Sequence, residues 1–509
     1  MATAGHVSVD VVALEQYERE RSRSPRGHVN LSDFKHSNLV AGRQERPDFL
    51  KRLYPHDRDD VCRMVEATHT YMVSISGEEE KPYPCSVTAV IGSFFDGFEQ
   101  CKVAQQVLRK AETRGLVNLE NSIYNLWVFL RCIQGLLDGP SVLSAAAATV
   151  RAAQQKYEAH GWPLPPPYAS WQAIEDLVTA GCQRHLQLCS CTPAYPEGDK
   201  CYFLCLVAGA TAQNIQDQWA RLGTINSMRG TILHKQAELM MQTMAEMQIE
   251  RGLKWATVSE LMALDEARIL RAADYKTALR DVAYGQQAAI WDQPFLQAAL
   301  QHDLRTSADS HEFRQLVSWL RAHPSLSPYR SEWSVVLEEY SIAGQIDSLW
   351  FDVNRWNPKG RIEGQVSPAI LMVDWKRARK YMEDDAAVHA RGRPAFPPKR
   401  GLPGGPCAHF LDTDHNHYLL QQSLYAYFLS EKYDVHVEEK WLVQIHPDLR
   451  SPDGALCDVN NVLLPEAPTL AKDALDKFVK EGWGKQKLGE TKWLELLRIR
   501  AQYVSPWTP

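Results

Sequence analysis

The segment Ser341–Lys376 carries the strongest indication of the fold: it begins SIAGQIDSLWFD, continues through a turn-rich loop and ends ILMVDWK. Its first part has the pattern of a β-strand, and Ile370–Val373 is a continuous apolar run, which is typical of a strand buried on both faces. Asp374 ends this run and Lys376 follows two residues later, so both side chains point to the same face of the strand. The segment therefore predicts two neighbouring strands with charged groups where the second one ends.

Charged groups at the end of a buried strand are costly unless the protein uses them. Asp347 in the first strand and Asp374 in the second make an oxygen-rich pocket that suits a hard divalent cation such as Mg²⁺. Lys376 beside such an ion can orient or deprotonate a water molecule. The alternative is a plain ion pair between Asp374 and Lys376 at the edge of the sheet, which is the commoner meaning of Asp-x-Lys on its own.

Further motifs accompany these strands in a fixed order along the chain. Gly230-Thr-Ile-Leu-His234 comes before them and Gln421-Gln-Ser-Leu-Tyr425 after them, both in helical patterns. The set resembles the RecB-like branch of the PD-(D/E)XK nuclease superfamily, which typically shows a G-T-x-x-H helix, a G-x-I-D strand, a D-x-K strand and a Q-x-x-x-Y helix. Eukaryotic and viral relatives, including the mitochondrial genome maintenance exonucleases, have features similar to Ser86-Val-Thr88, Trp219 and Arg330-Ser-Glu-Trp333.

The resemblance implies an α/β, restriction-endonuclease-like fold, with a mixed central sheet flanked by helices, a large helical N-terminal insertion and C-terminal helices. The gap of 27 residues between Asp347 and Asp374 is long for a hairpin, and it predicts an enlarged tip. The expected segments are a flexible tail (1–60), a strand-containing segment packing on the core (61–105), a helical insertion (106–215), the nuclease core (216–465) and C-terminal helices (466–509). The insertion has no counterpart in the family pattern.

Carried over residue by residue, the resemblance implies a site for Mg²⁺ or Mn²⁺. The metal ligands would be His234, Asp347, Asp374 and the main-chain carbonyl of Trp375. The catalytic residues would be Lys376, Asp374, Asp347, Gln421, Tyr425 and Glu332.

Some of these assignments compete with others. Glu332 is a candidate acidic site residue, but Glu338 and Glu339 compete with it. Gln421 and Tyr425 lie at i and i+4, so they share one helix face, where the family uses them to hold the lysine and the DNA backbone near the metal. The alternative for Tyr425 is plain core packing.

A local excess of basic residues follows the second strand, although the whole chain has a formal charge of −6. Arg377, Arg379 and Lys380, together with Gln421 and Tyr425, are the candidates for binding nucleic acid, because a basic flap can neutralise several phosphates. The alternative is a solvated loop with incidental charge. Trp333, Trp350, Trp356 and Trp375 are candidates to stack on exposed bases, although most of them are expected in the core.

The cysteine content, the apolar runs and the absence of certain motifs limit the kinds of protein that this chain can be. Eleven cysteines, an odd number, favour free thiols in a reducing, intracellular compartment, and no apolar run is long enough to span a membrane. The cysteines between Cys182 and Cys205 fit neither the iron–sulfur pattern of some RecB-like nucleases nor a common zinc motif, so an iron–sulfur cluster is not expected. No phosphate-binding Gly-x-x-x-x-Gly-Lys-Ser/Thr motif occurs, which leaves a separate helicase or replication protein as a candidate partner.

The sequence thus predicts a metal-dependent deoxyribonuclease that hydrolyses phosphodiester bonds, acting as an exonuclease or on particular structures of single-stranded or free-ended DNA. Two alternatives remain at this stage: a catalytically idle module on the same fold that binds nucleic acid or protein, and a nuclease that acts on RNA. Asp347, Asp374 and Lys376 favour an enzyme, because an idle copy has no reason to keep buried charges.

Overall fold

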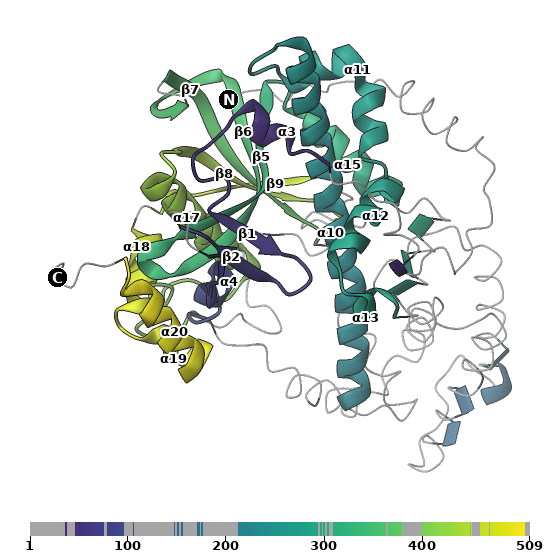
Figure 1. Ribbon diagram of the computed structural model, residues 1–509. Helices are drawn as coiled ribbons and strands as arrows, with labels where there is room; N and C mark the ends of the chain where they lie inside the picture. Colours follow the sequence, from purple (N-terminus) through teal and green to yellow (C-terminus); the bar gives the residue numbers. More distant parts are fainter. Residues whose placement is uncertain are drawn as a thin grey trace.

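The computed structural model describes residues 46–75, 79–95, 212–293, 309–362, 365–378, 400–447, 459–467 and 469–503, with short pieces and single residues elsewhere. These residues form a mixed α/β structure in which helices flank both faces of a six-stranded mixed sheet (Figure 1). The predicted α/β class and the mixed sheet flanked by helices are therefore confirmed.

The sheet is built around one long antiparallel hairpin. Its strands lie in the order β4, β6, β7, β8 and β9, and β5 also pairs with β6. Pairs β5–β6, β6–β7 and β8–β9 are antiparallel, whereas β4–β6 and β7–β8 are parallel. The strands are β4 (Cys85–Ser86), β5 (Leu326–Leu337), β6 (Ile342–Ile362), β7 (Gln365–Lys376), β8 (Val437–Gln444) and β9 (Asn460–Leu464).

The β6–β7 hairpin explains the long gap between the two aspartates. The register shifts twice along β6, between Asp352 and Trp356 and between Asn357 and Arg361, and such bulges bend and twist a strand pair. Ser348 pairs with Val373 at the other end of the hairpin. One step further along this register, Asp347 comes opposite Asp374.

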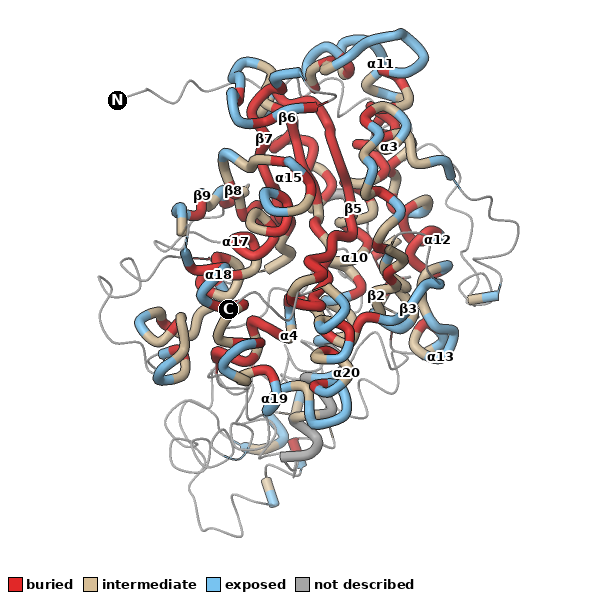
Figure 2. Tube along the Cα trace, turned by 60° about the vertical axis from the view of Figure 1, so that its left-hand side comes forward, coloured by how far each residue is buried: buried red, intermediate tan, exposed pale blue. Residues whose placement is uncertain are grey.

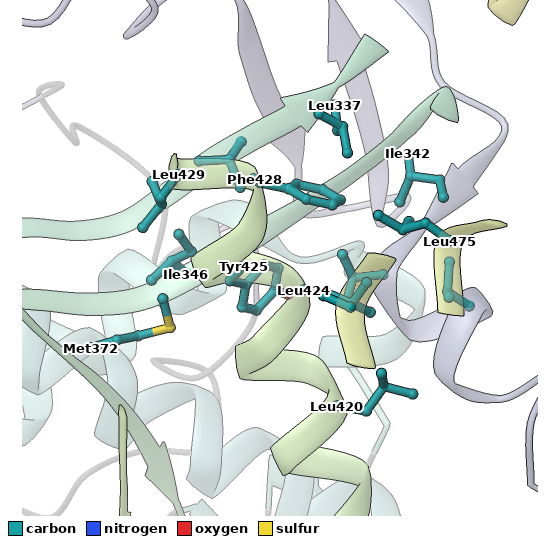
Figure 3. Close-up of a cluster of buried hydrophobic side chains, with 14 of the residues drawn as sticks. Leu337, Ile342, Ile346, Met372, Leu420, Leu424, Tyr425, Phe428, Leu429 and Leu475 are labelled. Carbon is teal, nitrogen blue, oxygen red and sulfur yellow. The ribbon is translucent and has the colours of Figure 1, made fainter. Parts of the chain in front are cut away.

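The apolar run of β7 is buried on both faces, as its sequence predicts. Leu371 and Val373 pack in the cluster that contains α10, whereas Ile370 and Met372 pack in the cluster that contains α17. Figure 3 shows Met372 beside Tyr425 and other side chains of that second cluster. This alternation places one helical layer on each face of the sheet.

Helices pack on both faces of the sheet. One face carries α10 (Ala212–Arg251), α11 (Val258–Ala272), α12 (Tyr275–Gly285), α13 (Ala288–Trp291) and α15 (Asp309–Ala322). The other carries α4 (Val87–Ile91), α17 (Asp414–Lys432), α18 (Leu470–Val479), α19 (Trp483–Leu488) and α20 (Glu490–Arg500). Figure 2 shows the central strands buried and the exposed segments at the periphery. The methionine stripe of α10 is core, because Met240, Met241 and Met244 are buried.

The end of the expected N-terminal tail is ordered, so the tail prediction is wrong for residues 46–60. This segment contains α3 (Phe49–Leu53), and Leu50 and Tyr54 are only 1% exposed. The buried guanidinium of Arg330 in β5 donates hydrogen bonds to the carbonyls of Leu50 and Tyr54, and it pairs with Asp59 at 3.1 Å. A partner about 270 positions away in sequence leaves no local signal of this contact.

The segment after residue 60 forms a small sheet of its own. β1 (Cys62–Val65), β2 (Thr70–Val73) and β3 (Lys81–Pro82) pair in this order, antiparallel. Cys62, Val73 and Tyr83 pack against Val336 and Ala343 of the large sheet. The small sheet therefore lies against the core.

Most of the expected helical insertion, 106–215, lies outside the described residues, as do Cys182, Cys189, Cys191, Cys201 and Cys205. The predictions made for that part of the chain stay predictions. Within the described helices, none combines the length and the apolar character needed to cross a bilayer.

The Arg330–Asp59 contact generates a prediction about stability. Asp59→Ala leaves a buried guanidinium without its carboxylate, which we expect to lower the free energy of unfolding by about 3 kcal/mol. Urea denaturation followed by circular dichroism measures this loss. Asp60→Ala is the matched control, because the Asp60 side chain is almost fully exposed and its contact with Lys51 is a surface pair. An equal loss in both variants would contradict the assigned role of Asp59.

Candidate metal centre

Three side chains from different elements converge at one end of the β6–β7 hairpin. His234 of α10, Glu332 of β5 and Asp347 of β6 each offer one ligand atom, and these atoms lie within 4.8 Å of one another. The His234 Nδ1 atom is 3.7 Å from Glu332 Oε1 and 3.6 Å from Asp347 Oδ2. All three residues are partly exposed, so the cluster is accessible to solvent.

The backbone of β5 places Glu332 in this cluster. The pairs Ser331–Ser348 and Trp333–Ile346 put Glu332 opposite Asp347. Glu332 has a φ of 46°, a left-handed conformation that a non-glycine residue adopts rarely and at a cost. Such strain is concentrated at functional sites.

The two competing glutamates are used elsewhere. Glu338 forms an ion pair with Arg58, and Glu339 forms one with Lys432. Of the three candidates that the sequence offers, the geometry brings Glu332 to the cluster.

The main chain of Trp375 connects the histidine to Asp347. The carbonyl oxygen of Trp375 lies 2.7 Å from His234 Nε2, and its amide donates to Asp347 Oδ2 at 3.0 Å. The first contact implies that Nε2 carries a proton, which directs Nδ1 towards the carboxylates. The sequence predicts this carbonyl as a metal ligand; in the structure it orients the histidine.

Asp374 and Lys376, at the end of β7, lie next to this cluster. Asp374 is only 4% exposed, and the Lys376 Nζ atom is 2.8 Å from its Oδ2 atom. The approach is poorly aligned, because the same Oδ2 atom makes no hydrogen bond of acceptable geometry. One oxygen of the buried Asp374 carboxylate is therefore in an ion pair with Lys376.

Burial and neighbouring charges together set the protonation of Asp374 and Lys376. Burial raises the pKa of Asp374 to about 7, and neighbouring Asp347 adds to this although Lys376 opposes it. Burial alone lowers the pKa of Lys376, but the Asp374 and Asp347 carboxylates outweigh it and raise that pKa. Lys376 is therefore a cation at neutral pH, which favours orienting water or an anion over accepting a proton.

The pKa of His234 is set by the same two opposing effects as that of Lys376, burial and neighbouring carboxylates. Burial lowers the pKa of His234, but Asp347 and Glu332 outweigh this effect and raise the pKa to about 9. The metal-free cluster thus holds protons that a divalent cation would displace.

Helix α17, on the face of the sheet opposite α10, carries the predicted Gln421 and Tyr425. Gln421 Nε2 donates to the Tyr425 hydroxyl at 3.4 Å. Tyr425 is buried against Gly344, where an added Cβ would lie 2.4 Å from Tyr425 Cε1. Tyr425 therefore packs behind β6 in the apolar cluster of Figure 3, which is the alternative that the sequence left open.

Tyr418 lies at this site as well, although it was not among the predicted residues. The Lys376 Nζ atom lies 4.4 Å from the centre of its ring, a cation–π contact. A signal was present, because Tyr418 precedes Gln421 by three residues and so shares its helix face.

The predicted nucleic-acid contacts are only partly placed near this site. The Arg377 side chain is buried, with Nε 2.6 Å from Glu312 and Nη1 3.2 Å from Asn226, so it is already paired within the protein. Arg379 and Lys380 lie outside the described residues. Of the four tryptophans considered for stacking, Trp333, Trp350 and Trp375 are buried and only Trp356 is exposed.

The donor set fits a hard divalent cation. It combines one imidazole nitrogen with carboxylate oxygens, the ligands that Mg²⁺ and Mn²⁺ accept, and Asp374 adds an oxygen without an aligned donor. Comparison with known proteins gives no further guidance: no protein-family model, no curated protein and no solved structure matches the chain.

The raised pKa values generate a prediction about metal binding. A divalent cation needs deprotonated ligands, whereas His234 below pH of about 9 and Asp374 below pH of about 7 hold protons without it. We expect Mn²⁺ affinity to rise by about ten-fold per pH unit for each proton displaced, between about pH 6 and about pH 8. Isothermal titration calorimetry in buffers of different ionisation enthalpy measures both the affinity and the proton release. A pH-independent affinity without proton release would contradict this protonation of the site.

Proposed function

We propose that this chain is a metal-dependent nuclease with a restriction-endonuclease-like arrangement of its sheet. One observation carries the proposal: His234, Glu332 and Asp347 converge at the end of the β6–β7 hairpin where Asp374 and Lys376 lie. The motifs that resemble the RecB-like branch supply these residues, apart from Glu332, in the expected order. A plain structural ion pair between Asp374 and Lys376 does not account for the additional histidine and glutamate.

Each residue has a role that follows from its position. His234 Nδ1, Glu332 and Asp347 would hold Mg²⁺ or Mn²⁺, with Asp374 as a further ligand once it has lost its proton. When bound, the ion supplies Lewis-acid stabilisation of the charge that develops on the phosphate. The Trp375 carbonyl and amide fix His234 and Asp347 in the required orientation.

Lys376 provides the fixed positive charge beside this site. Its ammonium group orients the attacking water and the scissile phosphate, and it stays protonated because two carboxylates raise its pKa. The Tyr418 ring and the Asp374 carboxylate hold the ammonium group in place. Water attacks phosphorus in line with the leaving oxygen, which gives a 5′-phosphate and a 3′-hydroxyl.

The proposed substrate is DNA that is single-stranded or has free ends. The described residues present no helix or ribbon with the features of a major-groove reader, so recognition through backbone and stacking contacts is favoured over base-specific contacts. A helicase or replication protein that exposes such strands is the proposed partner.

The first prediction from this proposal is a loss of cleavage in Asp347→Asn. We expect the rate with Mg²⁺ or Mn²⁺ to fall by about 100-fold or more, because the substitution removes a charged metal ligand. Asp352→Asn is the matched control: Asp352 lies on the same strand, is similarly buried and pairs with Arg355 away from the site. Its rate should stay within about two-fold of the wild type.

The assay should use end-labelled single- and double-stranded DNA, linear and circular, and RNA, each with Mg²⁺, Mn²⁺ or chelator. Cutting of circles would exclude a strict exonuclease, and cutting of RNA alone would replace the proposed substrate. A wild-type protein that cuts none of them while still binding DNA would instead support the idle binding module. Equal activity of Asp347→Asn and the wild type would refute the proposed site.

A further inference from the structure

Of the candidate metal ligands, Glu332 alone has a left-handed main chain, with a φ of 46°. This conformation costs free energy for any residue other than glycine, so the contacts around it must hold it in place. Gln345 of β6 donates a hydrogen bond to the Glu332 carbonyl oxygen at 3.2 Å. Further contacts hold the residues on either side of Glu332 along β5.

Arg330, two positions before the strained residue, is held by residues 46–60, which we call the brace segment. The guanidinium group of Arg330 is buried and donates hydrogen bonds to the carbonyl oxygens of Leu50 and Tyr54. It also pairs with Asp59 at 3.1 Å. Three acceptors from one segment therefore fix this part of β5.

Ser331, the next residue, is connected to the same segment through Gln242 of α10. The Gln242 Nε2 atom donates to the Ser331 hydroxyl at 3.5 Å and to Asp48 Oδ1 at 3.0 Å. The Gln242 Oε1 atom accepts from the amides of Phe49 and Leu50, at 2.8 and 3.2 Å. One side chain of α10 therefore joins the start of α3 to the residue that precedes the strained one.

Trp333, on the other side of Glu332, contacts the brace segment as well. The ring of His56 lies 5.5 Å from the Trp333 ring at 74°, an edge-to-face contact. His56 is itself fixed, because its Nε2 atom lies 2.8 Å from the carbonyl oxygen of Tyr433. The residues before and after Glu332 are thus both in contact with the brace segment or with the glutamine that binds it.

We propose that the brace segment, through Gln242 and Arg330, positions Glu332 as a ligand of the metal ion. A strained conformation persists only where its surroundings determine it, so loss of these contacts should let β5 relax and move the carboxylate away from His234 and Asp347. Gln242 is a positioning residue, because it acts through Glu332. The inference rests on the metal centre of the proposed function, but it does not require cleavage.

The alternative is that these contacts only anchor the N-terminal part of the chain. The two roles differ in their effect on metal binding. Anchoring alone changes the free energy of unfolding and leaves the affinity for the ion unchanged. Positioning changes the affinity, and it does so only while Glu332 can act as a ligand.

The test measures the Mn²⁺ affinity of the full chain by isothermal titration calorimetry, at a temperature where circular dichroism shows every variant folded. We expect Gln242→Met, which removes the four hydrogen bonds of this side chain, to weaken Mn²⁺ binding by about ten-fold. In a Glu332→Gln background, the same substitution should change the affinity by less than about two-fold, because the ligand that it positions is already lost. Asp59→Asn, which weakens the brace from the side of Arg330, should show the same dependence on Glu332.

Gln248→Met is the matched control. Gln248 is a buried glutamine on the same helix, but its side chain accepts from the Ala256 amide at 2.9 Å and not from the brace segment. Its Mn²⁺ affinity should stay within about two-fold of the wild type.

Wild-type Mn²⁺ affinity in Gln242→Met would overturn the proposal. A loss that persists in the Glu332→Gln background, or that Gln248→Met shows equally, would overturn it as well. A wild-type protein that binds no Mn²⁺ would reject both this role and the metal centre. The expected Mn²⁺ affinities together with no cleavage of any nucleic acid would keep the positioning role and reject the nuclease.

Discussion

The antiparallel register of β6 and β7 is the constraint on which the site depends, because it places the carboxylates of Asp347 and Asp374 opposite each other. Two neighbouring carboxylates, of which that of Asp374 is buried, repel each other unless a cation or a proton compensates them. The surrounding groups all act on this repulsion. Lys376 Nζ lies 2.8 Å from Asp374, and the Trp375 amide donates a hydrogen bond to Asp347. The pKa of Asp374 is raised to about 7, so this carboxyl group holds a proton at lower pH. A divalent cation would compensate the same charges more completely.

The rest of the fold holds this register in place. Helices on both faces bury the apolar side chains of β7, so that a slip by one residue would turn every one of them to the wrong face. Gly344 lets the Tyr425 ring lie directly against β6, since any side chain there would collide with it. Arg330 of β5 holds residues 46–60 against the sheet through its ion pair with Asp59. The candidate metal centre is therefore built on strands that are packed on both faces.

Sequence patterns predicted the parts of this arrangement that depend on local periodicity. The apolar run 370–373 became a strand buried on both faces, and His234 lies on the predicted helix. The choice of Glu332 over its neighbours depended on the β5–β6 register, which no local pattern contains. The pairing of Arg377 with Glu312 and the ordering of residues 46–60 depended on partners far away in sequence. The alternation of side chains between the two faces of β6 did not distinguish Trp356 from the buried tryptophans either. The reason is that the register of β6 shifts between Asp352 and Trp356.

The most direct test of the central claim is a crystal of the protein soaked in Mn²⁺ and measured at a wavelength where manganese scatters anomalously. We expect an anomalous peak about 2.1 Å from His234 Nδ1 and from oxygens of Glu332 and Asp347. Lys376 should remain within contact distance of Asp374 in that crystal. A well-ordered cluster without such a peak, at a Mn²⁺ concentration that occupies other sites, would contradict it.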